Sequence, residues 1–126
     1  MKFRTPLAQV RGLGSAKSGT HHWWLQRLTA VALIPLSLWF VASLLSIATA
    51  DYASAAAWLQ TPAAAILCCA FIVAVFYHGQ LGLQVVLEDY VHTEWLKLTC
   101  IVVAKLLSLL LAGVCLFAVL KVAFAS

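Results

Sequence analysis

Three long apolar stretches limit what this chain can fold into. They cover residues 28–50, 63–87 and 98–124, and each exceeds the roughly 20 residues that a helix needs to cross a hydrocarbon core about 30 Å thick. Because lipid offers no hydrogen-bond partners, the backbone of each stretch must pair within itself, which favours a helix. The sequence therefore predicts an all-α membrane protein. Residues 1–27 form a basic N-terminal segment, and residues 28–124 form an anchor domain of three transmembrane helices.

Composition excludes a soluble globular domain. The 126 residues are 64% hydrophobic and 10% charged, whereas about a quarter of the residues of a soluble domain are charged. The net charge of +4 would suggest nucleic acid in a soluble chain. Here the basic residues mostly lie outside the apolar stretches, so they are better explained as orientation signals, and no nucleic-acid partner is expected.

The basic residues predict how the chain is oriented in the membrane. Five of them precede the first apolar stretch without any acidic residue: Lys2, Arg4, Arg11, Lys17 and Arg27. The positive-inside rule therefore predicts a cytoplasmic N-terminus, with the connector at residues 88–97 on the same side. Lys121, near the opposite end, is a contrary signal. The chain is expected to cross its membrane several times.

The first apolar stretch has two competing explanations. Ala48, Thr49 and Ala50 resemble a signal-peptidase site, but the stretch is longer than the roughly 7–15 apolar residues of a signal peptide. The basic, acid-free N-terminal tail is also similar to an organelle transit peptide, although it lacks amphipathic periodicity. A retained transmembrane helix is the favoured interpretation.

His78 is the one histidine deep within an apolar stretch. It lies about ten residues, or roughly 15 Å of helix, from the cytoplasmic end of the second stretch, near mid-membrane. A polar residue at that depth is costly in free energy unless it has a partner or binds a ligand. It either hydrogen-bonds to another helix or binds haem iron, as histidines do in electron-transfer proteins. Gly79 and Gly82 would let a flat macrocycle, or another helix, approach closely.

Asp89 and Tyr90 follow His78 on the same predicted helix. Eleven residues are close to three helical turns, so His78 and Asp89 point from one face about 16 Å apart. A tyrosine hydroxyl beside an ionisable group suits hydrogen bonding to a quinone carbonyl. Alternatively, Tyr90 is an interfacial aromatic residue and Asp89 a solvated acid.

The spacing of these residues resembles a known family. A histidine, a glycine four residues later and Asp-Tyr after eleven and twelve are similar to the second helix of the hydrophobic membrane-anchor proteins of succinate dehydrogenase, which are cytochrome b556 components. Gly19, His21 and Arg27, placed just before the first apolar stretch, resemble the N-terminal side of that family. The resemblance covers nearly the whole chain. It is to alphaproteobacterial members of the family, which implies a location in the bacterial inner membrane.

The resemblance implies roles for five residues. His78 would be an axial ligand of haem b, Tyr90 would hydrogen-bond to ubiquinone, and Asp89 would support that site. Arg27 and His21 would lie near the haem propionates or the quinone pocket. A plain positive-inside anchor is an equally reasonable interpretation of Arg27.

The partners follow from the number of ligands. A haem with two histidine ligands needs a second polypeptide, because His78 is the only candidate here; either a homodimer or a different protein supplies it. The resemblance implies the other membrane component of succinate dehydrogenase, so this chain would be half of a heterodimeric haem-binding helix bundle. It also implies an iron–sulfur protein and a flavoprotein on the cytoplasmic face. Alone, the chain would not be catalytic.

Two residues depart from this pattern. His22 stands where some family members have an acidic residue. Lys105, within the third apolar stretch, has no family role; it either extends its ammonium to the interface or pairs with a haem propionate. The four cysteines lie in apolar stretches, have no metal-ligand spacing, and are expected to act as packing residues.

The resulting hypothesis is a membrane anchor of succinate dehydrogenase, that is, complex II of the respiratory chain and the tricarboxylic acid cycle. Two alternatives remain open. One is the anchor of a fumarate reductase or another haem b quinone oxidoreductase. The other is a small non-redox membrane protein in which His78 only packs.

Overall fold

The computed structural model describes residues 5–10 and 19–125, and the regular elements within these ranges are all helices. They are α1 (Pro6–Val10), α2 (Gly19–Ile47), α3 (Tyr52–Leu59), α4 (Pro62–Tyr90) and α5 (Glu94–Ala123). Among them α2, α4 and α5 are long and apolar enough to cross a membrane. This confirms the prediction of an all-α protein with three transmembrane helices.

Each long helix extends beyond its apolar stretch at the end of the molecule where α2 begins and α4 finishes. Helix α2 begins at Gly19 instead of residue 28, α4 continues to Tyr90, and α5 begins at Glu94. Apolar character marks where a helix meets hydrocarbon, whereas its hydrogen-bonded backbone continues through polar residues at the interface. Helix α2 therefore runs through residue 27, where the sequence places the end of the basic segment. Lys2, Arg4, Arg11 and Lys17 of that segment lie outside the described residues.

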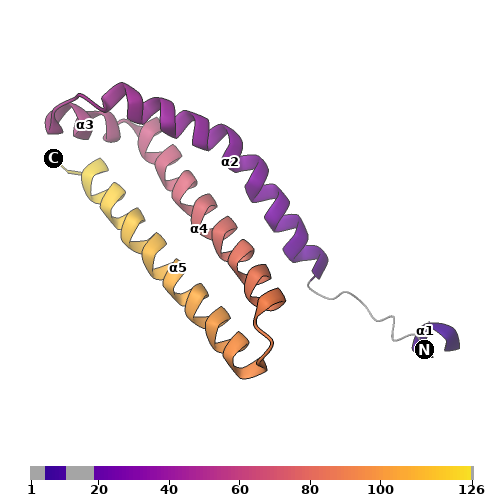
Figure 1. The fold of residues 1–126 in the computed structure, drawn as a ribbon. Helices are drawn as coiled ribbons and strands as arrows, with labels where there is room; N and C mark the ends of the chain where they lie inside the picture. Colours follow the sequence, from indigo (N-terminus) through magenta and orange to yellow (C-terminus); the bar gives the residue numbers. More distant parts are fainter. Residues whose placement is uncertain (1–4, 11–18, 126) are drawn as a thin grey trace.

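Helix α4 is the centre of the fold. It packs against both α2 and α5, and these two pairings account for most contacts between elements. Figure 1 shows the three long helices side by side, with α4 in the middle and α3 near the C-terminal end of α5. One stacked aromatic pair supports the α2–α4 interface, because the rings of Phe40 and Phe71 lie 4.5 Å apart between centroids.

Few side chains are buried in this arrangement. Within the described ranges the buried hydrophobic residues are Ala64, Cys68, Ala74 and Leu81, all on α4. Three of the four are small, which lets neighbouring helices approach closely, as is usual in membranes. Most of the large apolar side chains of α2 and α5 remain exposed. Such surfaces are suited to lipid or to further transmembrane helices.

A short helix closes the end opposite Gly19. Asp51 caps α3, and its carboxylate accepts a 3.0 Å hydrogen bond from the Ser54 backbone N–H. The Gln60 side chain donates to the Ala125 carbonyl over 2.9 Å, and the Trp58 ring stacks on Trp39. These contacts connect α3 to both outer helices. The opposite end of α4 is joined to α5 by a turn of only three residues, 91–93.

Candidate functional site

His78 faces the interface between α4 and α2. Its side chain is half-buried, and its Nδ1 lies 3.0 Å from the hydroxyl oxygen of Thr29 on α2. The two residues are 49 positions apart in the chain, so only helix packing brings them together. The contact satisfies one polar atom of a histidine placed deep in an apolar helix, where an unpaired polar group is costly.

The direction of this hydrogen bond depends on the tautomer of His78, and the other contacts of the Thr29 hydroxyl favour one direction. The Thr29 hydroxyl has one proton, which it donates to the Leu25 carbonyl over 2.7 Å or, less directly, to the Gln26 carbonyl over 3.1 Å. With the proton on that side, the Thr29 oxygen accepts a hydrogen bond that His78 donates from Nδ1. A neutral imidazole with its proton on Nδ1 carries a free lone pair on Nε2. That nitrogen is available to bind a metal.

The two glycines after His78 have different surroundings. A Cβ on Gly82 would lie 3.5 Å from the side-chain nitrogen of Gln26, an ordinary contact, so this position is where α2 crosses closely. A Cβ on Gly79 would meet no atom within 4 Å. Gly79 therefore faces open space beside His78, where a planar group has room.

Asp89 and Tyr90 are the last two residues of α4. Both side chains are exposed, and Tyr90 has 78% of its surface accessible. The helix is continuous from His78 to Tyr90, so the expected axial separation of about 16 Å between His78 and Asp89 applies. Asp89 and Tyr90 thus stand at the helix end, where a ligand or another protein can reach them.

His21 and Arg27 lie on different sides of α2. Six helical positions correspond to a rotation of about 240°. The Arg27 guanidinium lies 5.2 Å from the centroid of the Trp23 ring, a cation–π contact, and its side chain is exposed. His21 instead lines a groove on another side of the helix. One ligand group in contact with both residues would have to reach around α2.

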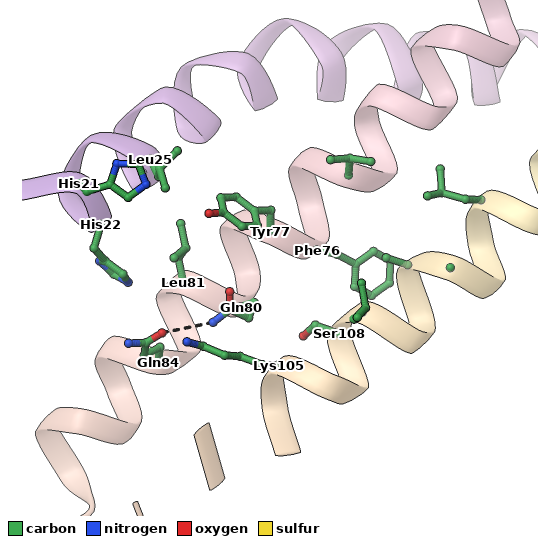
Figure 2. Close-up of a pocket in the computed structure, with 15 residues that line it drawn as sticks. His21, His22, Leu25, Phe76, Tyr77, Gln80, Leu81, Gln84, Lys105 and Ser108 are labelled. Atoms are coloured by element: carbon green, nitrogen blue, oxygen red, sulfur yellow. Dashed lines mark hydrogen bonds between the residues drawn. The ribbon is translucent and has the colours of Figure 1, made fainter. Parts of the chain in front are cut away.

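That groove has a volume of about 640 Å³ and involves all three long helices. We call it the lateral groove. Figure 2 shows His21, His22 and Leu25 from α2 above it, with Gln80 and Gln84 from α4 and Lys105 from α5 close to one another. His78 is not among its lining residues.

A polar ladder that the sequence interpretation missed runs along α4. Gln80 donates to the Gln84 side-chain oxygen over 3.3 Å, and Gln84 donates to Glu88 over 2.7 Å. The signal for it was the spacing of four residues, which places side chains one turn apart on a helix. Thr29, also missed, has no comparable local signal, because its partner is distant in sequence.

Comparison with known proteins identifies relatives of the chain. Residues 1–120 match the family described as succinate dehydrogenase/fumarate reductase transmembrane subunit. The chain is 39% identical over 108 residues to the succinate dehydrogenase hydrophobic membrane anchor subunit of Rickettsia bellii, covering 86% of both chains. It is 34% identical to the Rickettsia conorii protein of that name, over 82% of this chain and 83% of that one. The succinate dehydrogenase hydrophobic membrane anchor subunit of Paracoccus denitrificans is 29% identical over 90 residues, which cover 71% of this chain and 70% of that protein. No solved structure matches the chain.

Proposed function

The chain belongs to the family of succinate dehydrogenase and fumarate reductase transmembrane subunits, and from this premise we propose that it anchors a succinate dehydrogenase in the bacterial inner membrane. Three membrane-spanning helices and the identity of 39% to a hydrophobic anchor protein support this role. The basic residues before α2 support a cytoplasmic N-terminus. The redox part of the proposal rests on one observation, the hydrogen bond between the His78 ring and Thr29 on α2.

His78 would hold haem b through Nε2. The hydrogen bond from Nδ1 to Thr29 supports this assignment, because it orients the ring and leaves Nε2 with its lone pair. The open space at Gly79 supports it as well. When bound, haem b supplies a one-electron redox centre whose potential depends on its axial ligands. The second axial ligand would come from the other membrane component of the complex, completing a bundle shared by two chains.

The quinone site would form at the end of α4. The Tyr90 hydroxyl would donate a hydrogen bond to a carbonyl oxygen of ubiquinone, and Asp89 beside it would keep that end of the site polar. The exposure of both side chains is consistent with a site completed by partner proteins. Arg27 would pair with a carboxylate at the membrane edge, such as a haem propionate.

Partner proteins would deliver the electrons. Succinate would be oxidised by the flavoprotein of the complex, and the iron–sulfur protein would carry electrons to ubiquinone at the cytoplasmic end of the helices. This chain would anchor both of them, together with the other membrane component. Alone it would not be catalytic.

A reduced-minus-oxidised optical spectrum of the purified complex tests the His78 assignment. We expect a low-spin b-type spectrum in the wild type that is lost or becomes high-spin in His78→Ala. His92→Ala is the matched control, since His92 is exposed in the turn after α4 and should leave the spectrum unchanged. A wild-type complex without haem, or an unaltered spectrum in His78→Ala, would remove His78 as a ligand.

A fumarate reductase anchor is the second candidate, because the matching family covers the transmembrane subunits of both enzymes. The same His78 and Tyr90 chemistry would then serve quinol oxidation. Extracting the quinone bound to the complex and measuring turnover in both directions separates the two. Ubiquinone and faster succinate oxidation support the first candidate; menaquinone and faster fumarate reduction support the second.

A further inference from the structure

The lateral groove lies on a side of α4 away from Gly79. The α4 residues that line it include Val73, Tyr77, Gln80 and Gln84, whose spacing of four, three and four residues defines one stripe along the helix. Gly79, with open space around it, is rotated by about 200° from Tyr77 on the same helix. Gly79 and His78 do not line the groove, although Phe76, one turn before Gly79, does, so the groove adjoins the open face beside His78 without including it.

The groove is polar at one end and apolar at the other. His22, Gln84 and Lys105 lie at the end where α2 begins and α4 finishes. Further along α5 the lining becomes apolar, with Leu109, Ala112, Gly113 and Leu116. A Cβ on Gly113 would meet no atom within 4 Å, so this part of the groove is open. The shape and polarity fit an amphiphile with one polar end.

Lys105 carries a charge where none is expected. It is seven residues beyond the start of the apolar stretch at residue 98, or about 10 Å along α5, and its neighbours in sequence are apolar. Within residues 5–10 and 19–125 the structure has one ion pair, between Lys97 and Glu94, so Lys105 has no carboxylate partner there. A cation at such depth is costly without a counter-charge or water.

His22 adds a second unsatisfied group to the same end. Its Nε2 is shielded from solvent and has no hydrogen-bond partner among the described residues. Buried polar atoms of this kind usually have a partner, which here would come from outside the described residues. An anionic group that accepts hydrogen bonds and sits between His22 and Lys105 would satisfy both residues.

We propose that the lateral groove binds one anionic phospholipid of the cytoplasmic leaflet. Its phosphate would lie between Lys105 and His22, and one acyl chain would run along Leu109, Gly113 and Leu116. Basic pockets between transmembrane helices on the cytoplasmic side are recognised binding sites for anionic headgroups. The proposal depends on the chain spanning the membrane with its N-terminus in the cytoplasm. His21, which the family resemblance places near the haem propionates or the quinone, also lines the groove, so the proposal requires the phosphate to be held by Lys105 and His22 and not by His21.

Native mass spectrometry of the purified complex tests this proposal. The complex is delipidated, returned to phosphatidylglycerol nanodiscs and released into detergent. We expect the wild type to keep a bound phosphatidylglycerol, and Lys105→Gln to bind it at least about tenfold more weakly, because one charge-assisted contact is lost. Lys97→Gln is the control: it removes a lysine of α5 that pairs with Glu94 outside the groove, and retention should be unchanged.

A second variant tests the acyl part. Gly113→Leu keeps Lys105 but fills the open portion of the groove, so it should also release the lipid. Equal retention by the wild type and both variants would overturn the proposal. The proposal would also be overturned if inorganic phosphate alone bound in place of the lipid. A cross-link from Ser108→Cys that places a partner helix in the groove would overturn it too. A quinone recovered in place of the lipid would overturn it as well. The haem spectrum, recorded on the same samples, reports on His78 separately.

Discussion

At position 78 one hydrogen bond, to the hydroxyl of Thr29 on α2, orients a histidine ring. The same hydroxyl lies 2.7 Å from the Leu25 carbonyl, and when it donates there its oxygen accepts from Nδ1 of His78. The partner of a metal-binding histidine typically sets which nitrogen is free. Thr29 is therefore the residue through which α2 would influence the proposed haem ligand.

Replacing Thr29 tests this directly. Thr29→Val keeps the shape of the side chain but removes the acceptor, so His78 loses its orienting bond; we expect haem affinity to fall about 10- to 100-fold, as for comparable partners of metal ligands. Thr29→Ser retains the hydroxyl and should restore binding. Haem titration and the electron paramagnetic resonance g-values of the oxidised complex give the measurement. If the Val and Ser variants behave alike, the hydrogen bond is only a packing contact.

Tyr90 is the residue on which the quinone site depends. Tyr90→Phe removes one hydroxyl, and a single hydrogen bond contributes about 0.5–1.5 kcal/mol net, so kcat/KM for ubiquinone should fall by about 2- to 10-fold or more. Because Tyr90 is twelve residues from His78, the haem spectrum should not change. Steady-state quinone reduction with the purified complex measures the effect. Unaltered turnover would show that Tyr90 is an interfacial aromatic residue.

At the scale of elements, the helix ends carry the polar chemistry. Helix α2 brings His22 to the lateral groove only because it begins at Gly19, well before its apolar part, and α4 carries Asp89 and Tyr90 because it continues to its last polar turn. The helices are apolar in the middle, where they meet lipid. Hydrogen bonds and charges are least costly at their ends, where water and lipid headgroups are available.

The cap of α3 makes a pH-dependent prediction. Hydrogen bonds from the Ser54 side chain and backbone N–H lower the pKa of the Asp51 carboxyl below its usual value of 3.8. A lowered folded pKa means that the cap stabilises α3 at pH values above the usual pKa and is lost as pH falls through the folded pKa. Hydrogen exchange of the Ser54 amide should therefore be protected at neutral pH and lose protection in strong acid.

Two substitutions separate the cap from its charge. Asp51→Ala should remove protection of the Ser54 amide at every pH, because no acceptor remains. Asp51→Asn keeps an acceptor oxygen without a titrating group, so its protection should persist in acid. Protection in Asp51→Ala equal to that of the wild type would show that α3 is held by the Trp39–Trp58 stack and the Gln60 contact instead.

The described part of the molecule buries few side chains for its size. Only α4 contributes buried residues in the described ranges, and α2 and α5 flank it without enclosing it. Hydrocarbon does not drive apolar helices together as water does, so close packing of small side chains and polar contacts such as that of His78 must hold the helices. The proposed partner proteins and lipid would cover apolar surface that these helices leave exposed.

Topology provides the prediction at this scale. Three spanning helices and a cytoplasmic N-terminus place the C-terminus on the outer side of the membrane. Alkaline phosphatase fused after Ser126 should be active, and green fluorescent protein at the same position should be dark. When the chain is truncated after residue 92, in the turn following α4, fused alkaline phosphatase should be inactive and fused green fluorescent protein should fluoresce. The reverse result would mean that the chain has the opposite orientation in the membrane, with the lateral groove in the outer leaflet.

The sequence by itself determined the three spans, because length and apolar character are local properties to which a bilayer responds directly. It also determined the candidate residues His78, Asp89 and Tyr90, since their spacing lies within one helix, and the family that this spacing indicates matches the chain's relatives. The short helix α3 and the extended helix ends were not predicted, because polar interfacial turns carry no long apolar signal.

Only the tertiary structure decided which residues meet. A helix that is apolar on all sides has no stripe to show which face turns inward, so the rotations of α2 and α5 about α4 cannot be inferred from periodicity. Those rotations place Thr29 on His78 and bring Lys105 and His22 to one groove. Each of these contacts joins residues on different helices or different faces, and packing of small side chains along α4 selects among the possible arrangements.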